Sequence, residues 1–346
     1  MMNMSKVIRI TKELLSNKRI TNIKKFFLDY FNEFNISISE DRDCYSLFLQ
    51  RKDYSYCEDL SKGLADLNIS KNELDTFFVV SNKVGFFLSE NWLPYVWSII
   101  SNNYSGRTAI FHVDDHKDMM SPYIAKTPNG FIDMISRERI SLRNSDSIKY
   151  SIDNGSITIG SVLTAIICLM GQDLDIFHLK RNVGNYSGTY SKRIAIEDVF
   201  GVQDHRIYLD ISSERYDYFA KYICSSSESY LAKQIVDYDN VIIHFDMDYF
   251  NNRYNGTTAW EKEWPNEGYN LSEQCLRMKE ICECLYNHLD KVCNKYILIG
   301  VSPSFYPCEF WGKGIWTLLN NLKEIDKDVI EIQKRLFPTA YYEKNI

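Results

Sequence analysis

Two uninterrupted apolar runs, each followed at once by acidic residues, constrain the fold of this chain more than any other feature. Thr108–Val113 leads into Asp114, and Val241–Phe245 leads into Asp246. A strand with one face in water alternates apolar and polar residues, whereas a strand covered on both faces is apolar throughout. These runs therefore predict parallel strands in the middle of a sheet that has helices on both faces.

Other segments fit the same architecture, and we expect an α/β protein with three layers and a mainly parallel sheet over residues 76–346. Helical patterns cover Asn91–Ile100 and Ser272–Val292. Further strands are predicted at Phe77–Val80, Val84–Leu88, Asp175–Leu179 and Tyr296–Val301. Residues 1–75 are predicted to form a helical N-terminal extension, with helices over Ser5–Leu15, Ile20–Phe34 and Tyr56–Leu67.

Composition excludes several classes of protein. A length of 346 residues with 45% hydrophobic and 25% charged residues is that of a globular chain, not a disordered one. A net charge of −6 argues against general nucleic-acid binding. No apolar run approaches the ~18 residues of a membrane span, and the first residues lack the apolar region of a secretory signal. Nine scattered cysteines without a CxxC pair predict reduced thiols and a cytoplasmic location.

The acidic residues after the two runs form a pattern that suits a metal centre. Side chains at i and i+2 share a side of an extended strand, so Asp114, His116 and Asp118 can converge, as can Asp246 and Asp248. Four carboxylates that close together would repel one another strongly without cations. Carboxylates with one imidazole suit Mn²⁺, and a pair of such ions lowers the pKa of a bridging water.

Two further histidines, His112 and His244, stand two residues before Asp114 and Asp246. They lie on the same side of their strands as these acids, and a supporting or core role is predicted for them in place of metal ligation. Motifs for other chemistry are missing, since the chain has no glycine-rich phosphate loop and no GxSxG nucleophile motif.

The chain resembles the arginase/deacetylase superfamily of binuclear manganese ureohydrolases, in which DxHxD is followed far downstream by DxD. The resemblance covers residues 77–312 and narrows to a branch of largely uncharacterised arginase-like proteins. That branch includes the peptide arginases of ribosomal-peptide (RiPP) biosynthesis, which convert arginine side chains of a precursor peptide to ornithine. The segments that carry it are Phe111–Met119, Thr158–Gly160, Phe245–Phe250 and Val301–Glu309, the last with a Ser-Pro-x-Phe element.

The resemblance implies a role for each matching residue of the two acidic motifs. Asp114 and Asp246 would bridge two ions, His116 would bind one of them, and Asp248 would be a further ligand. Asp118 would bind the other ion and accept a hydrogen bond from the bridging hydroxide that attacks the guanidinium carbon. Beyond these motifs, Glu309 would be the carboxylate that pairs with the substrate guanidinium, a planar cation suited to a bidentate acceptor.

Three positions depart from the family pattern. The usual histidine ligand upstream of the first motif is missing from Ser89–Pro94, where Asn91 or Glu90 could substitute as an oxygen ligand. Without a substitute, one ion would be weakly held, or only one would bind. Asp115 stands where a small residue is usual, and Gly160 with Ser161 stands where related sequences often carry a polar or acidic pair.

The expected function is therefore that of a manganese-dependent hydrolase, with two Mn²⁺ ions, that converts peptidyl arginine to ornithine and urea. Its expected partner is an arginine-containing peptide, with no nucleic acid and no membrane, and the sequence leaves homo-oligomer formation open. Two alternatives remain: a metal-dependent amidohydrolase or deacetylase of the same fold, and a metal-poor, non-catalytic binding protein.

Overall fold

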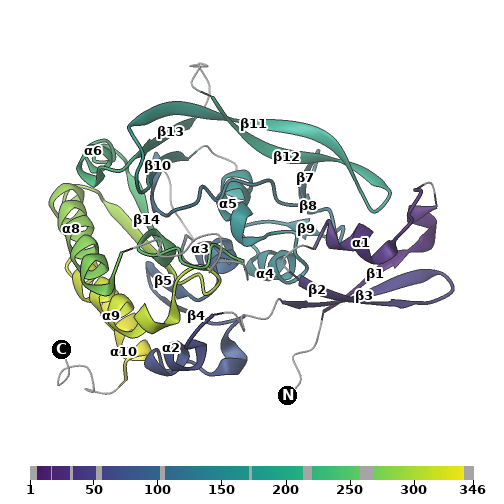
Figure 1. Ribbon diagram of the computed structural model, residues 1–346. Helices are drawn as coiled ribbons and strands as arrows, with labels where there is room; N and C mark the ends of the chain where they lie inside the picture. The colour runs from purple at the N-terminus through teal and green to yellow at the C-terminus, as the bar shows by residue number, and fades with distance from the viewer. Residues whose placement is uncertain are drawn as a thin grey trace. The chain divides into compact units, whose positions relative to one another are not determined.

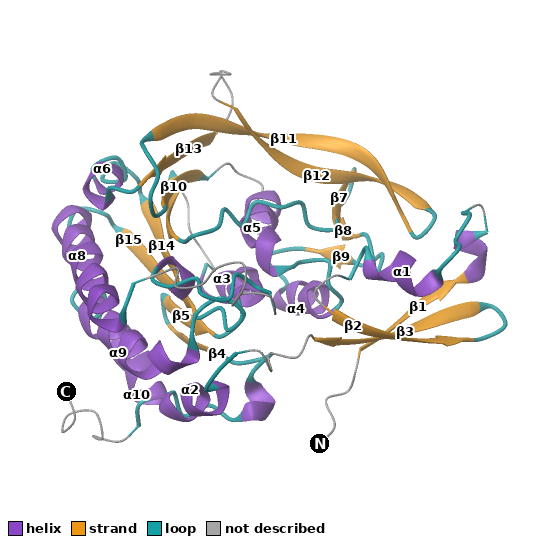
Figure 2. Ribbon diagram, viewed as in Figure 1, coloured by secondary structure: helices purple, strands orange, loops and turns teal. Residues whose placement is uncertain are grey.

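The computed structural model describes residues 6–16, 18–31, 34–51, 57–101, 106–170, 174–212, 220–257 and 269–338. The protein is α/β, with parallel and antiparallel neighbours in a large mixed sheet (Figure 1 and Figure 2). Two compact units alternate along the chain. The smaller unit comprises Met1–Asp53, Asp118–Gln172 and Ser191–Asp210, and the larger comprises Tyr54–Lys117, Asp173–Tyr190 and Ile211–Ile346.

The larger unit contains the parallel strands that the sequence predicts. From β5 to β13 each strand runs parallel to its neighbours, and β4 pairs antiparallel with β5 at one edge. At the other edge, residues 186–190 of β11 (Tyr186–Val199) pair antiparallel with β13. The hydrogen-bonded order is β4 (Phe78–Ser81), β5 (Val84–Phe87), β15 (Asn294–Gly300), β14 (Asn240–Asp246), β6 (Thr108–Val113), β10 (Asp175–Leu179) and β13 (Ala220–Ser225).

Helices and 3₁₀ turns of the larger unit cover both faces of these strands. Phe111, Ile243 and Ile299 on one face share an apolar core with buried residues of α8, α9 and α10. On the other face, α3 packs against β5 and β15. These elements are α2 (Leu60–Asp66), η2 (Lys71–Glu73), η3 (Glu90–Trp92), α3 (Leu93–Ile100), α6 (Glu228–Ala232), η5 (Met247–Tyr249), α8 (Leu271–Leu289), η6 (Cys308–Phe310), α9 (Trp311–Leu322) and α10 (Val329–Leu336).

One row of residues crosses the face that α3 covers. Strand register aligns Gly85 of β5 with Leu298 of β15, and then His244, His112 and His178 of the next three strands. The three imidazoles are fully buried. Because residues two positions further along a strand share its face, Asp114 and Asp246 follow this row at the carboxyl ends of their strands. Sites in parallel sheets form at that edge.

The smaller unit contains a three-stranded antiparallel sheet in the order β1-β3-β2. The rest of β11 belongs to this unit, as does β12 (Val202–Ser212) up to Asp210. The unit also carries β7 (Ile124–Thr127), β8 (Gly130–Asp133) and β9 (Arg139–Ile140). Its remaining elements are β1 (Lys6–Thr11), η1 (Lys12–Leu15), α1 (Ile23–Leu28), β2 (Phe34–Glu40), β3 (Cys44–Arg51), α4 (Ser145–Asp153), η4 (Ile159–Ser161) and α5 (Val162–Met170).

The prediction of a helical N-terminal extension is wrong for most of its length. Residues 6–11 form a strand, residues 34–51 form a hairpin, and α1 covers only Ile23–Leu28 of the second predicted helix. The segment Lys6–Thr11 alternates, with Val7 exposed and Ile8 and Ile10 buried, which is the period of a strand. Pairing with β3 then decides the conformation, because tertiary contacts override a weak helical propensity. The separation of residues 1–75 from a metallohydrolase domain over residues 76–346 stays a prediction.

Two global expectations concern the membrane and the thiols. Within the described ranges, the helices are too short or too polar to span a bilayer. All nine cysteines are free thiols in the structure.

Candidate metal centre

The site begins where β6 and β14 end side by side. These parallel strands pair from Asn240 and Thr108 up to Phe245 and Val113, so their carboxyl ends lie at the same edge. Asp114 directly follows β6, and Asp246 is the last residue of β14. Each is almost fully buried.

Asp114, His116 and Asp248, three residues of the two acidic motifs, converge on one point. Each of them offers one ligand atom, and the three atoms lie within 4.8 Å of one another. His116 Nδ1 is 2.7 Å from Asp248 Oδ2 and 3.7 Å from Asp114 Oδ1. The carboxylates are buried, whereas the His116 side chain is 35% exposed and faces the rim. This group could hold a metal ion.

Local hydrogen bonds hold the carboxylates of the site in place. Asp114 Oδ1 accepts from the backbone N–H of His116 at 2.5 Å, and Asp246 Oδ1 accepts from that of Asp248 at 3.1 Å. These are the i to i+2 turns that aspartate favours where a strand ends. The Ser302 hydroxyl donates to Asp246 Oδ2 at 2.7 Å. The side chains are therefore preorganised, with little conformational entropy left to lose on binding a ligand.

The surroundings of His116 fit a divalent cation. A metal-binding histidine usually donates its second ring N–H to an oxygen, which fixes the ring. Here Nδ1 faces the two carboxylates, while Nε2 lies 3.4 Å from Asn255 Oδ1. A cation beside Nδ1 would also offset the like charges of Asp114 and Asp248.

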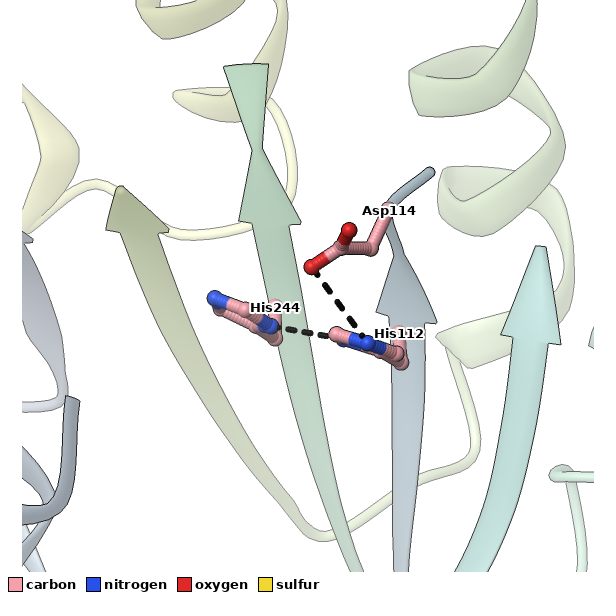
Figure 3. A group of neighbouring side chains, drawn as sticks. All are labelled: His112, Asp114 and His244. Atoms are coloured by element: carbon pink, nitrogen blue, oxygen red, sulfur yellow. Dashed lines mark hydrogen bonds and ion pairs between the residues drawn. The ribbon is translucent and has the colours of Figure 1, made fainter. Parts of the chain in front are cut away.

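A second group shares Asp114 and lies deeper in the sheet. His112 Nδ1 and His244 Nδ1 are 2.8 Å apart, and His112 Nε2 is 3.4 Å from Asp114 Oδ2 (Figure 3). His112, Asp114 and His244 could also hold a metal ion. Burial lowers the pKa of His112 well below its usual value, and the neighbouring His178 and His244 lower it further. The His112 ring is therefore neutral at pH 7.

His178 completes the buried row but has a different environment. Its Nδ1 is 2.8 Å from the Tyr222 hydroxyl and its Nε2 is 3.0 Å from the backbone oxygen of Asp114. Burial lowers its pKa to about 4. A neutral ring satisfies both contacts, since it donates to the carbonyl and accepts from the hydroxyl.

Asp115, the unexpected charge of the first motif, is neutralised by its neighbours. Burial opposes its ionisation, but Arg181, at 2.9 Å from Asp115 Oδ2, and Asn252, at 3.1 Å, bring its pKa below the usual value. The Lys180 ammonium also donates to the Asp115 backbone oxygen at 2.7 Å. Asp115 therefore orders the rim and adds no uncompensated charge.

Glu309, the expected partner of a substrate guanidinium, contacts a guanidinium of the chain itself. Arg253 Nη1 is 2.5 Å from Glu309 Oε1, and the Arg253 guanidinium carbon lies 5.4 Å from the centre of the Phe310 ring. The other oxygen, Glu309 Oε2, is buried and has no hydrogen-bond partner within the described part of the chain. One carboxylate oxygen is thus engaged by arginine and the other is open to a second donor.

The two remaining predicted ligands, Asn91 and Asp118, are both buried. Asn91 is buried in η3, and neither of its amide atoms has a hydrogen-bond partner among the described residues. The neighbouring Glu90 contacts His244. Asp118 is the first residue of its segment in the smaller unit, is buried, and has a φ of 52°. The roles of Asn91 and Asp118 as ligands stay predictions.

Comparison with known proteins does not assign the chain to a family. Neither protein-family models nor curated proteins match it. The site therefore has to be interpreted from its own geometry. Sequence reasoning did not predict the contact of Glu90 with His244. The signal in the sequence was that His112 and His244 each stand two residues before an acid, which places both histidines on the same face as the site.

Proposed function

We propose that this chain is a manganese-dependent hydrolase of the arginase-like branch, acting on the guanidinium of peptidyl arginine to give ornithine and urea. The observation that carries the proposal is the convergence of Asp114, His116 and Asp248 from two neighbouring strand ends. Buried carboxylates with one imidazole form a donor set for a hard or borderline divalent cation, and Mn²⁺ fits that set.

Asp114, His116, Asp246 and Asp248 would hold the cations in this proposal. When bound, divalent manganese supplies Lewis acidity and a lowered pKa for water at neutral pH. Asp118, two residues after His116 in sequence, would bind a cation as well and accept a hydrogen bond from the attacking water, which orients that water. Its substitution by asparagine keeps the shape but removes the negative charge that strengthens this hydrogen bond.

Glu309 would orient the substrate. Its contact with Arg253 supports a carboxylate that accepts a guanidinium at this position, with one further oxygen available. With Arg253 in place, Glu309 offers one oxygen to a substrate guanidinium, and a bidentate contact requires the release of Arg253. Such a bidentate contact discriminates a planar cation from an ammonium, which favours arginine over lysine as the side chain recognised.

The decisive experiment measures bound metal and urea release on the purified full chain. Metal content is determined after incubation with Mn²⁺ and desalting, and urea is followed with an arginine-containing peptide and with free arginine. We expect bound Mn²⁺ and urea from the peptide only. Asp246→Ala should abolish urea release, whereas Asp237→Ala, at an exposed aspartate outside the site, should leave it unchanged.

Other results would favour other functions. Bound Mn²⁺ without urea from any arginine substrate contradicts the ureohydrolase proposal and favours an amidohydrolase or deacetylase, tested with an acetyl-lysine peptide. A chain that binds no metal would instead be a metal-poor binding protein. Full activity of Asp246→Ala would show that the site is misplaced.

A further inference from the structure

The two histidines below the proposed ligands belong to a longer buried chain of contacts. Glu90 Oε1 is 2.7 Å from His244 Nε2, His244 Nδ1 is 2.8 Å from His112 Nδ1, and His112 Nε2 is 3.4 Å from Asp114 Oδ2. Each of the four side chains is at most 3% exposed. We call Glu90, His244, His112 and Asp114 the Glu90–Asp114 chain.

Three strands and one turn build this chain. Parallel register places His244 of β14 opposite His112 of β6, and the two rings stack with an interplanar angle of 10°. Glu90 is the first residue of η3, and its carboxylate lies against Gly300 of β15. A Cβ at Gly300 would lie 1.9 Å from Glu90 Oε2, so only glycine leaves room for this carboxylate.

Only the middle contact of the chain is a hydrogen bond, and it joins the Nδ1 atoms of His244 and His112. The two outer contacts bring an imidazole nitrogen close to a carboxylate oxygen, His244 to Glu90 and His112 to Asp114. As a metal ligand, Asp114 is ionised and has no proton to offer, so an Nε2–H tautomer of His112 is the one that suits this contact. His112 Nδ1 then accepts from His244 Nδ1–H.

We propose that Glu90, His244 and His112 are positioning residues for the metal ligand Asp114. Through Oδ2 they fix the carboxylate, and they leave Oδ1 on the side of His116, where a cation would bind. The inference rests on the proposed function, since Asp114 is a ligand only if the centre binds metal. Both histidines would act together on Asp114, and neither would contact the substrate directly.

The test is a titration of the full-length chain with Mn²⁺ alone, in which calorimetry measures the affinity for Mn²⁺. We expect His112→Phe and His244→Phe each to weaken Mn²⁺ binding by about 10- to 100-fold, the usual cost of losing a group that supports a ligand. The double variant should bind no more weakly than the weaker single variant, because one broken link already releases Asp114. His205→Phe, at an exposed histidine of β12, is the matched control and should bind like the wild type.

Conservative variants separate positioning from simple packing. Glutamine keeps one donor and one acceptor, so His112→Gln should recover most of the affinity that His112→Phe loses. Equal affinity in the wild type and the phenylalanine variants overturns the proposal, as does equal loss in His112→Gln and His112→Phe. Additive losses of Mn²⁺ affinity in the double variant would show that the two histidines act independently, and this would overturn the proposal.

A spectroscopic readout on the wild type does not depend on any variant folding. The chain has six histidines, so selective ¹⁵N labelling with diamagnetic Mg²⁺ present can assign their tautomers. We expect an Nε2–H tautomer for His112, and an Nδ1–H tautomer there overturns the proposal. Failure of the wild type to bind Mn²⁺ defeats the proposed function as well, whereas normal binding in every variant defeats only the positioning role.

Discussion

At the scale of single residues, the carboxylates of the site are held by neighbours that the fold brings to them. The Ser302 hydroxyl donates to Asp246, and the Arg181 guanidinium pairs with Asp115. These contacts leave few conformations to each side chain, and the site therefore gains its order before any ligand arrives. Single substitutions should act on binding or reactivity with little effect on the fold.

Arg253 is predicted to compete with substrate for Glu309. Under the proposed function, Arg253→Met frees Glu309 Oε1 and should lower KM for an arginine peptide about three- to tenfold, with kcat nearly unchanged, because ground-state competition is removed. Steady-state urea release measures this. Arg193→Met, which removes an exposed ion pair with Asp210, is the control. A raised KM would instead show that Arg253 supports the carboxylate.

The thiols are predicted to differ sharply in reactivity. Burial raises the pKa of Cys168 to about 12, and it also raises that of Cys282 and Cys308, so these thiols stay protonated and unreactive at pH 8. Cys293 is exposed. A disulfide exchange reagent added to the native protein should therefore show a fast phase that disappears in Cys293→Ser and persists in Cys282→Ser. Persistence of that phase in Cys293→Ser would contradict the assignment.

At the scale of elements, close backbone approach and caps decide how helices meet the sheet. Helix α8 begins after Asn270, whose side chain accepts from the Glu273 N–H while the Glu273 carboxylate accepts from the Asn270 N–H. Helix α3 reaches β5 only because Gly85 has no side chain. Local sequence predicts where such elements begin, whereas their contacts depend on partners distant in the chain.

Gly85→Ala is predicted to destabilise the contact between α3 and β5. The added Cβ would lie 2.2 Å from Val96 Cγ1, and overpacking of this kind usually costs about 1–3 kcal/mol. Urea unfolding with an unchanged m-value measures the loss. Gly184→Ala, at a glycine whose Cβ would meet nothing within 4 Å, should stay within about 0.5 kcal/mol of the wild type. Equal stability of Gly85→Ala would show that α3 shifts without cost.

At the scale of the whole molecule, a row of buried imidazoles lies in the middle of the sheet, next to carboxylates. This arrangement makes global stability depend on pH and, if metal binds, on metal concentration. Both dependences are properties of the folded state as a unit, because the unfolded chain has ordinary histidines and no assembled centre.

Acid should weaken the fold through His178. Its pKa is about 4 in the folded state and about 6.5 in the unfolded chain, so between these values the unfolded state binds more protons. The free energy of unfolding should therefore fall as pH decreases from 6.5 to 4, by about 3 kcal/mol from this group. Urea unfolding in EDTA across this range measures the slope. His178→Gln should flatten it, whereas the exposed-site variant His205→Gln should not.

Metal should raise stability by mass action. With free Mn²⁺ at 100 times its Kd, binding to the folded state alone adds about 2.7 kcal/mol to the free energy of unfolding. Thermal melts in EDTA and in a series of Mn²⁺ concentrations test this. Asp248→Asn should show a much smaller shift, and a shift equal to that of the wild type would exclude Asp248 as a ligand.

The sequence by itself determined the central strands and the acids at their ends. Continuous apolar runs predict β6, β14 and β15 as buried parallel strands, and the spacing of Asp114 and His116 predicts a shared side, because both signals are local. The N-terminal strands escaped prediction, since β1 is a strand only through its pairing with β3. The resemblance to arginase-like proteins likewise came from the sequence and stays a proposal.

Only the tertiary structure decided which strands became neighbours, and with that the composition of the buried site. His112 and His244 are 132 residues apart and meet because β14 pairs with β6, and Glu90 reaches them across a glycine of β15. No local pattern specifies such a register, because it depends on the combined packing of both sheet faces. The physical reason is that local periodicity fixes the face of each side chain, whereas its partners depend on the packing of the whole sheet.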